Sequence, residues 1–148
     1  MKDIGWLEVR LKIPDDWELT AESGGLNDAY MRFNSIEKIK MEVRWERVKK
    51  KGEALPYTAI ENFLKSVVKS SKEKAATKVT EKGNAKVAGH RAAYYIWSMK
   101  DARYVTMSWL CQDEGKLMLL QYGLEEAEAK EELFEEILKN ISCHTDLD

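Results

Sequence analysis

The sequence is poor in cysteine, proline and glycine, the residues that cross-link small secreted proteins and interrupt regular structure. Its 148 residues include two cysteines, two prolines and eight glycines. Cys111 and Cys143 are too few for a secreted disulfide framework, and neither lies in a CxxC pair, so we expect free, buried thiols. A disulfide between them is the alternative, because intracellular proteins of hyperthermophiles do carry such bonds.

Long apolar runs are also missing from the sequence. No stretch reaches the roughly 18 uninterrupted apolar residues that a membrane span needs, and residues 1–6 lack the apolar core of a secretion signal. We therefore expect a soluble, cytoplasmic protein without a membrane partner. Charged residues make up 34% of the chain and glutamine occurs only at Gln112 and Gln121, a composition that favours a thermophile source.

Motifs for catalysis, phosphate binding and metal binding are absent from the sequence. The Asp-x-Asp-x-Asp-Gly pattern of a calcium loop does not occur. Cys143 and His144, followed by Asp146 and Asp148, resemble half of a zinc site whose other ligands are missing. The sequence therefore predicts no metal, no cofactor and no enzyme activity.

Alternating apolar and polar residues predict an antiparallel sheet within one domain, residues 1–148. The predicted strands cover residues 6–13, 17–22, 29–34, 41–49, 91–99, 104–111 and 116–122. The meander order of the first four favours antiparallel pairing. Strands 91–99 and 104–111 carry apolar residues on both sides, which is typical of central strands in a sheet covered on both faces.

Two amphipathic helices are predicted, over residues 56–74 and 125–140. Each has an apolar stripe at helical spacing: Ile60, Phe63, Leu64, Val67 and Val68 in the first, and Leu133, Phe134, Ile137, Leu138 and Ile141 in the second. Together with the two-sided strands they favour an α+β fold, a mainly antiparallel sheet with one helix packed on each face. The alternative places both helices on one face and leaves Tyr94, Ile96, Tyr104 and Leu110 exposed or lining a groove.

Charge is strongly segregated along the chain. Residues 1–35, 36–105 and 106–148 carry formal charges of −3, +9 and −8. A basic patch in the middle segment would suit a nucleic-acid partner. Its candidate residues are Arg44, Arg47, Lys49, Lys50 and Lys51.

His90 and Arg91 lie at a predicted hairpin tip, where two interpretations compete. With Asp113 or Glu114 from another turn they could form an acid-base or anion site, because histidine titrates near neutral pH. Gly89 and His90 are also a natural turn pair, and no nucleophile is placed by a motif. We therefore interpret the segment as a structural turn.

All five tryptophans lie in strand-like segments, and most are expected in the core. Trp45 and Trp97 lie on apolar strand faces. Trp6 and Trp17 are the members that we expect at the surface.

Two turns give the chain a resemblance to a known family. They are Ile13-Pro14-Asp15-Asp16-Trp17 and the hairpin Val87-Ala88-Gly89-His90-Arg91-Ala92-Ala93. With the order of four strands, helix, four strands, helix, the chain resembles PsbP-like domains, which include PsbP, the Ran-binding Mog proteins, DcrB-like proteins and secretion-effector chaperones. The resemblance implies a three-layer α/β/α fold used mostly for non-enzymatic binding, and no functional residues transfer with it.

The sequence thus favours a binding module, an adaptor or chaperone-like accessory protein that holds a protein segment on a sheet face or loop edge. The candidate partner-binding residues are Trp6, Trp17, His90, Arg91 and Tyr94. A nucleic-acid-associated protein and a small-molecule carrier with an aromatic pocket are the alternatives. An exposed sheet edge could also pair two copies as a homodimer.

Overall fold

A computed structural model of the chain describes residues 1–6, 9–25, 28–35, 38–48, 55–70, 76–111 and 115–143. Within this part the elements follow in the order β1 (Lys2–Trp6), β2 (Val9–Ile13), β3 (Glu18–Gly24), β4 (Asp28–Ser35), β5 (Lys38–Arg47), α1 (Leu55–Ser70), β6 (Lys78–Val87), β7 (His90–Met99), β8 (Ala102–Cys111), β9 (Lys116–Gly123), α2 (Leu124–Ala129) and α3 (Glu131–Lys139). No helix in these ranges is long and apolar enough to cross a membrane.

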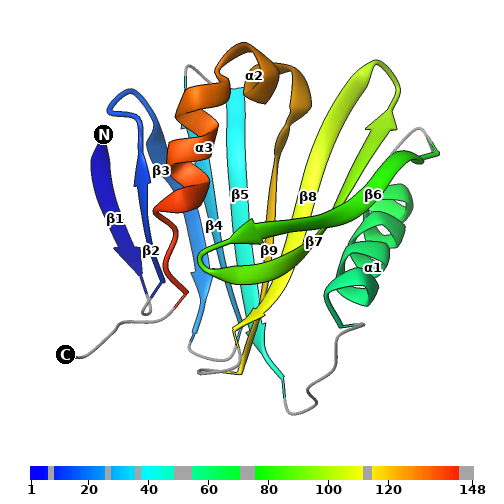
Figure 1. Cartoon of the computed structure of the whole chain (residues 1–148), viewed down its shortest axis with the longest axis horizontal. Helices are drawn as coiled ribbons and strands as arrows, with labels where there is room; N and C mark the ends of the chain where they lie inside the picture. The colour runs from blue at the N-terminus through cyan, green and yellow to red at the C-terminus, as the bar shows by residue number, and fades with distance from the viewer. Residues whose placement is uncertain are drawn as a thin grey trace.

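The main sheet has seven strands in the order β3-β4-β5-β9-β8-β7-β6, and every neighbouring pair is antiparallel (Figure 1). It consists of two meanders, β3-β4-β5 and β6-β7-β8-β9, joined where β5 pairs with β9. β8 and β9 are therefore central strands, and their apolar residues face both sides, as the sequence predicts for residues 104–111.

The prediction of a single strand over residues 6–13 is wrong, because the chain reverses there. β1 and β2 form a separate two-stranded antiparallel sheet in which Trp6 pairs with Val9. Cross-strand partners point to the same side of a sheet, so the reversal moves Trp6 from the predicted polar side to the side of the buried Val9. The alternating pattern could not reveal this, because a hairpin preserves a period of two.

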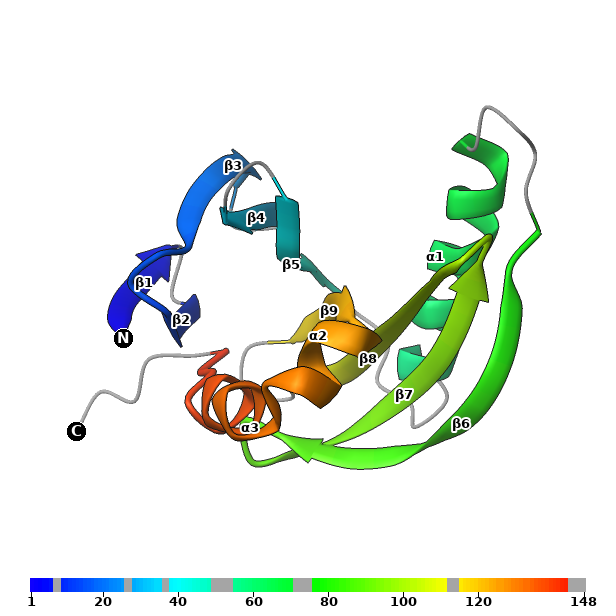
Figure 2. The same cartoon turned by 90° about the horizontal axis from the view of Figure 1, so that it is seen from above.

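The sheet is covered on both faces, as predicted. Ile60 and Leu64 of α1 pack on one face against Tyr95 and Trp97. The other face packs against the β1-β2 hairpin and against α3, which contributes Phe134 and Ile137 to the larger core cluster. Figure 2 shows α1 and α3 on opposite sides of the curved sheet.

Both predicted helices form, although residues 71–74 of the first lie outside the described residues, and the second helix is interrupted. Pro56 lies in the first turn of α1, where its missing N–H costs no hydrogen bond. The predicted helix 125–140 is divided at Lys130, whose φ of −128° and ψ of 51° lie outside the helical region. This break turns α3 so that its apolar stripe, with Phe134 and Ile137, faces the core.

Candidate functional site

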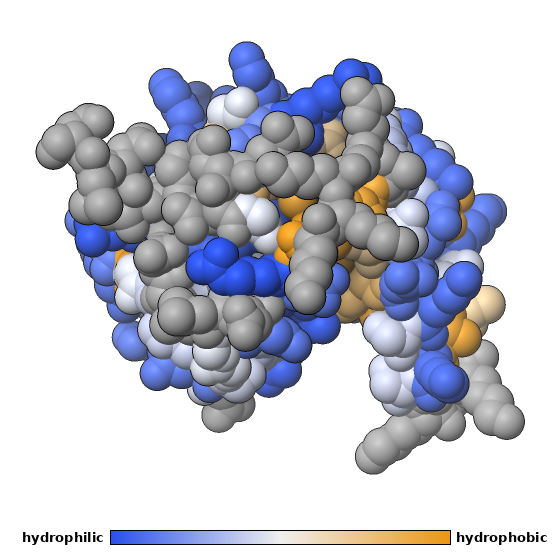
Figure 3. Space-filling model, turned by 90° about the horizontal axis from the view of Figure 1, so that it is seen from below, coloured by the Kyte–Doolittle hydropathy of each residue, from blue (hydrophilic) through white to orange (hydrophobic). Residues whose placement is uncertain are grey.

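A groove runs along α1, because the helix covers only part of its sheet face. α1 packs over β7, β8 and β9, whereas the same face of β4 and β5 carries partly exposed polar side chains such as Arg32 and Glu42. The groove beside the helix has a volume of about 910 Å³. Figure 3 shows apolar residues at the bottom of the hollow beside the protruding part of the molecule that contains α1.

The helix side of the groove is aromatic. Phe63 of α1 contacts Trp97 edge-on, with ring centres 6.5 Å apart. Trp97 also stacks on Tyr104 at 4.7 Å, and its indole N–H donates to the hydroxyl of Thr106 at 2.9 Å. The three rings hold one another in place and present a rigid apolar wall.

The sheet side of the groove is organised around Glu42. Tyr30 Oη donates to Glu42 Oε1 at 2.9 Å, and Arg32 Nε donates to Tyr30 Oη at 2.7 Å. Burial and this contact with Glu42 raise the pKa of Tyr30, so the phenol stays a donor. A guanidinium nitrogen of Arg44 lies 3.9 Å from the second oxygen of Glu42.

Arg44 reaches across the groove to the helix. Its guanidinium carbon lies 5.1 Å from the centre of the Phe63 ring and 5.2 Å from that of Tyr30. Arg44, Phe63 and Ser66 also line a second cavity of about 260 Å³. The two cavities therefore adjoin and form one elongated depression along α1.

An ion pair lies at the end of the groove near α2. Lys40 Nζ donates to both oxygens of Glu126, at 2.7 and 2.6 Å, and the two side chains are only 13% and 19% exposed. Burial alone would raise the pKa of Glu126, but the hydrogen bond and charge of Lys40, helped by Lys130, lower it overall. Glu126 is therefore held as a carboxylate.

Gln121 of β9 lines the groove with an unsatisfied acceptor. Its Oε1 atom is buried and has no hydrogen-bond partner among the described residues. An unsatisfied buried polar atom costs about 1–3 kcal/mol. A bound molecule that offers a donor to Oε1 would recover part of this cost only after the side chain turns this buried atom toward the groove.

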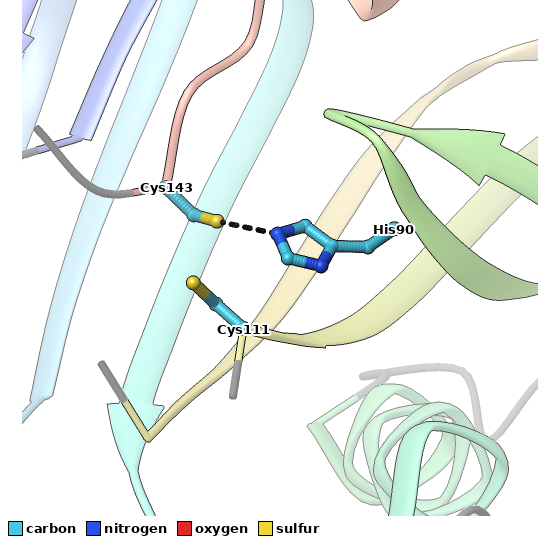
Figure 4. Close-up of side chains that lie close together, drawn as sticks. All are labelled: His90, Cys111 and Cys143. Atoms are coloured by element: carbon cyan, nitrogen blue, oxygen red, sulfur yellow. Dashed lines mark hydrogen bonds between the residues drawn. The ribbon is translucent and has the colours of Figure 1, made fainter. Parts of the chain in front are cut away.

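A second cluster lies where β7 begins and β8 ends, and it joins three residues that are distant in sequence. His90, Cys111 and Cys143 point toward one another from the β6-β7 hairpin, the end of β8 and the segment after α3 (Figure 4). His90 Nε2 lies 3.3 Å from Cys143 Sγ, and the nitrogen and both sulfur atoms all lie within 4.8 Å of one another.

Both cysteines of this cluster are buried and carry thiols instead of a shared disulfide, as the sequence predicts. The hydrogen bond of Cys111, burial and the charge of Cys111 raise the pKa of Cys143, while Trp109 acts in the opposite direction. The backbone of the Cys143 segment is held by paired hydrogen bonds between Arg10 and Ser142, at 2.9 and 2.8 Å. Lys116 Nζ also donates to the carbonyl oxygen of Cys143 at 3.1 Å.

Trp17, a candidate partner-binding residue, is buried, so the expectation of a surface position is wrong. It is 1% exposed, and its ring centre lies 5.9 Å from that of Phe134. Trp17 follows the turn that Pro14 and Asp15 begin, and its N–H donates to the Pro14 carbonyl at 3.0 Å. This turn directs the indole under α3. Trp6 is half-buried and packs edge-on against Trp45.

The remaining candidate partner-binding residues lie near β6 and β7. Arg91 is exposed, His90 is half-buried in the thiol cluster, and Tyr94 is half-buried. Tyr94 Oη donates to Glu81 at 2.7 Å across the β6-β7 pair. None of the three lines the groove beside α1.

The basic residues of the middle segment are only partly described. Arg44 faces the groove and Arg47 is exposed at the end of β5, whereas Lys49, Lys50 and Lys51 lie outside the described residues. Asp113, Glu114, His144, Asp146 and Asp148 also lie outside them. The nucleic-acid interpretation therefore stays a prediction.

Sequence reasoning missed the thiol cluster and the groove for different reasons. The positions of Cys111 and Cys143 in the sequence give no distance between them. The groove depends on how far α1 covers the sheet. The alternation of Glu42 and Arg44 with buried Val43 was the available signal for a polar open face on β5.

Comparison with known proteins identifies the fold. No family model matches the sequence, and no curated protein matches it. The solution structure of cyanobacterial PsbP (CyanoP) from Synechocystis sp. PCC 6803 superposes with a TM-score of 0.65 and 11% sequence identity, covering 91% of this chain and 86% of that chain. At this identity the similarity establishes the fold alone, so the predicted PsbP-like fold is confirmed: the chain has a PsbP-like α+β architecture.

Proposed function

We propose that this chain is a non-enzymatic adaptor or chaperone-like module, and that the groove beside α1 holds an extended segment of a protein partner. The observation that supports this function is the groove itself, with an aromatic wall on one side and fixed charges on the other. Ligand sites combine an apolar surface with a few placed polar groups in this way.

The length of the groove favours a polypeptide segment. The cavities of about 910 and 260 Å³ adjoin at Arg44, Phe63 and Ser66. An apolar side chain of the partner would pack against Phe63 and Tyr104, whose contacts with the buried Trp97 fix their orientation before binding. Preorganised walls reduce the entropy lost on association.

The polar groups of the groove suit the backbone of such a segment. Gln121 offers an acceptor for an amide N–H once its side chain turns the buried Oε1, which has no partner in the described part of the chain, toward the groove. Glu42 and Glu126 are already neutralised, by Arg32 and Arg44 and by Lys40. The groove therefore presents donors and acceptors with little net charge, which favours a neutral segment with an apolar anchor.

The test blocks the groove without removing a core contact. Ser66 is exposed on α1 and lines both cavities, so Ser66→Trp fills the groove. Lys65→Trp places the same indole on an exposed neighbouring position outside the groove and is the matched control. Peptides selected from a displayed random library on the wild-type protein are then titrated against both variants, after circular dichroism has shown that each is folded.

We expect selected peptides to bind the Lys65→Trp variant as they bind wild type and to lose at least tenfold in affinity for Ser66→Trp. Equal binding to both variants would overturn the groove as the site. Loss of binding in Arg91→Ala, with Ser66→Trp unchanged, would instead place the partner at the β6-β7 hairpin.

A small-molecule carrier is the second candidate, which the stacked Trp97 and Tyr104 favour. A flat aromatic ligand could extend this stack, and the larger cavity falls within the volume range of small-molecule sites. Native mass spectrometry of the protein from its source tests this function. A bound small molecule in wild type and Lys65→Trp, absent from Ser66→Trp, would favour the carrier over the protein-binding module.

A further inference from the structure

We propose that His90, Cys111 and Cys143 form a binding site for a single thiophilic d¹⁰ metal ion, Zn²⁺ or Cu⁺. This site lies outside the groove beside α1 and does not depend on the function proposed for it. The three side chains supply two thiolate sulfurs and one imidazole nitrogen, the donor set that soft and borderline metal ions select.

The spacing of the donor atoms fits one ion. Zn–S bonds of about 2.3 Å and Zn–N bonds of about 2.0–2.1 Å place the donor atoms of a tetrahedral site about 3.5–3.8 Å apart. His90 Nε2 and Cys143 Sγ are 3.3 Å apart, and all three donor atoms lie within 4.8 Å of one another. Small side-chain shifts, with no rearrangement of the backbone, would therefore bring all three donor atoms to bonding distance from one ion.

The donors are held from three directions by different elements. The Arg10–Ser142 hydrogen bonds attach the Cys143 segment to β2. Cys111 is fixed opposite Lys116 in the β8-β9 pair, and His90 opposite Val87 in the β6-β7 hairpin. A site whose ligands are positioned by sheet pairing loses little conformational entropy on binding an ion.

Two neighbouring polar groups fit a site that becomes anionic when the thiols ionise. The indole N–H of Trp109 is buried without a hydrogen-bond partner among the described residues. Lys116 is fully buried and donates to the Cys143 carbonyl. Outer-shell donors of this kind orient metal ligands and stabilise their charge.

Charge distinguishes the two candidate ions. Two thiolates and Zn²⁺ give a neutral complex, whereas two thiolates and Cu⁺ give a complex of charge −1 that the side chain of Lys116 would balance. Either ion displaces the two thiol protons to solvent and leaves the imidazole neutral, so the exchange involves no oxidation or reduction. His90 is half-buried, so one side of the site remains open to a water molecule or another ligand.

The experiment titrates the full chain, stripped of metal with a chelator and kept reduced with a phosphine, with Zn²⁺ and separately with Cu⁺. Competition against a chromophoric chelator gives the stoichiometry and affinity. Co²⁺ then serves as a spectroscopic probe, because thiolate-to-metal charge-transfer absorption reports the number of sulfur ligands. The variants are Cys111→Ser, Cys143→Ser, Cys143→Ala and His90→Gln, with Arg91→Gln as a matched control on the same hairpin.

We expect one equivalent of Zn²⁺ or Cu⁺ to bind wild type and Arg91→Gln. Losing one ligand should weaken binding by more than the roughly 10- to 100-fold that loss of an outer-shell partner costs. Each single cysteine variant should also show about half of the Co²⁺ charge-transfer absorption. Because a buried cysteine variant can fail to fold, His90→Gln, at a half-buried position and checked by circular dichroism, keeps the test decisive.

Two results would overturn the proposal. One is the absence of stoichiometric binding by reduced wild-type protein with either ion. The other is binding that Cys143→Ala and His90→Gln leave unchanged. In either case the cluster would be a histidine–thiol contact within the core.

Discussion

Arg44 of β5 lies over the ring of Phe63 of α1, with 5.1 Å between the guanidinium carbon and the ring centre. This contact joins the sheet side of the groove to the helix side. It also lies where the two cavities adjoin and form one elongated depression.

Arg44 and Phe63 should be energetically coupled. A double-mutant cycle with Arg44→Gln and Phe63→Leu is expected to give a coupling energy of about 0.5–1 kcal/mol in urea unfolding, the size of a partly exposed cation–π contact. A cycle with Arg32→Gln and Phe63→Leu is the control, because Arg32 lies over Tyr30 instead. Coupling in the control cycle equal to that of the Arg44 cycle would show that the contact with Phe63 is not the cause.

The Lys40–Glu126 ion pair should make stability depend on acid pH. Its hydrogen bonds lower the pKa of Glu126 below the ordinary value of 4.5 in spite of burial. The pair therefore stabilises the fold above about pH 4.5, and the contribution is lost as pH falls through the lower folded-state pKa. Unfolding free energies measured from pH 7 to pH 3 should fall less steeply for Glu126→Gln than for wild type.

At pH 7, Glu126→Gln should cost about 1–3 kcal/mol, because Lys40 loses its charged partner. Glu135→Gln, on the exposed face of α3, is the matched control and should change little. If the free energy of unfolding of Glu126→Gln falls with pH as steeply as that of wild type, the pH dependence arises from other carboxylates.

Trp17 and Arg91 should respond in opposite ways to truncation. Trp17 is 1% exposed beneath α3, so Trp17→Ala is expected to lower the free energy of unfolding by about 3–5 kcal/mol. Arg91 is exposed, so Arg91→Ala should change it by no more than about 0.5 kcal/mol. Denaturant unfolding of both variants checks this, and a wild-type midpoint for Trp17→Ala would contradict the buried position.

The Oε1 acceptor of Gln121 should lower the stability of the fold and strengthen the binding of a partner. Gln121→Leu removes the unsatisfied Oε1 acceptor while roughly preserving volume, so we expect unchanged or higher stability, by up to about 1 kcal/mol. If the acceptor receives an amide N–H of the partner, the same variant should bind the selected peptides more weakly. A destabilised variant with unchanged binding would show that Gln121 has only a structural role.

The elements that the sequence predicted well are those with a strong periodic pattern. The stripe containing Ile60 and Leu64 identified α1, and the apolar residues on both sides of 104–111 identified a central strand. Both patterns report burial directly, because the period of the chain decides which residues share a face. The predicted PsbP-like fold rested on the order of these elements and is confirmed.

The wrong predictions concern places where a local pattern is the same for two structures. Alternation continues through the β1-β2 turn, so residues 6–13 read as one strand. The apolar stripe predicted for the helix 125–140 begins only at Leu133, so it gives no sign of the break at Lys130. Trp17 follows a turn whose direction no residue type encodes, so its burial under α3 was hidden.

The sequence by itself determined which residues avoid water and how often the chain alternates between its two sides, and these properties specify strands, helices and a sheet covered on both faces. The tertiary structure alone decided which distant side chains meet. The distance between Cys111 and Cys143 and the width of sheet left open beside α1 arise from strand order and helix placement. Those depend on the summed packing of the whole chain, and no local pattern records them.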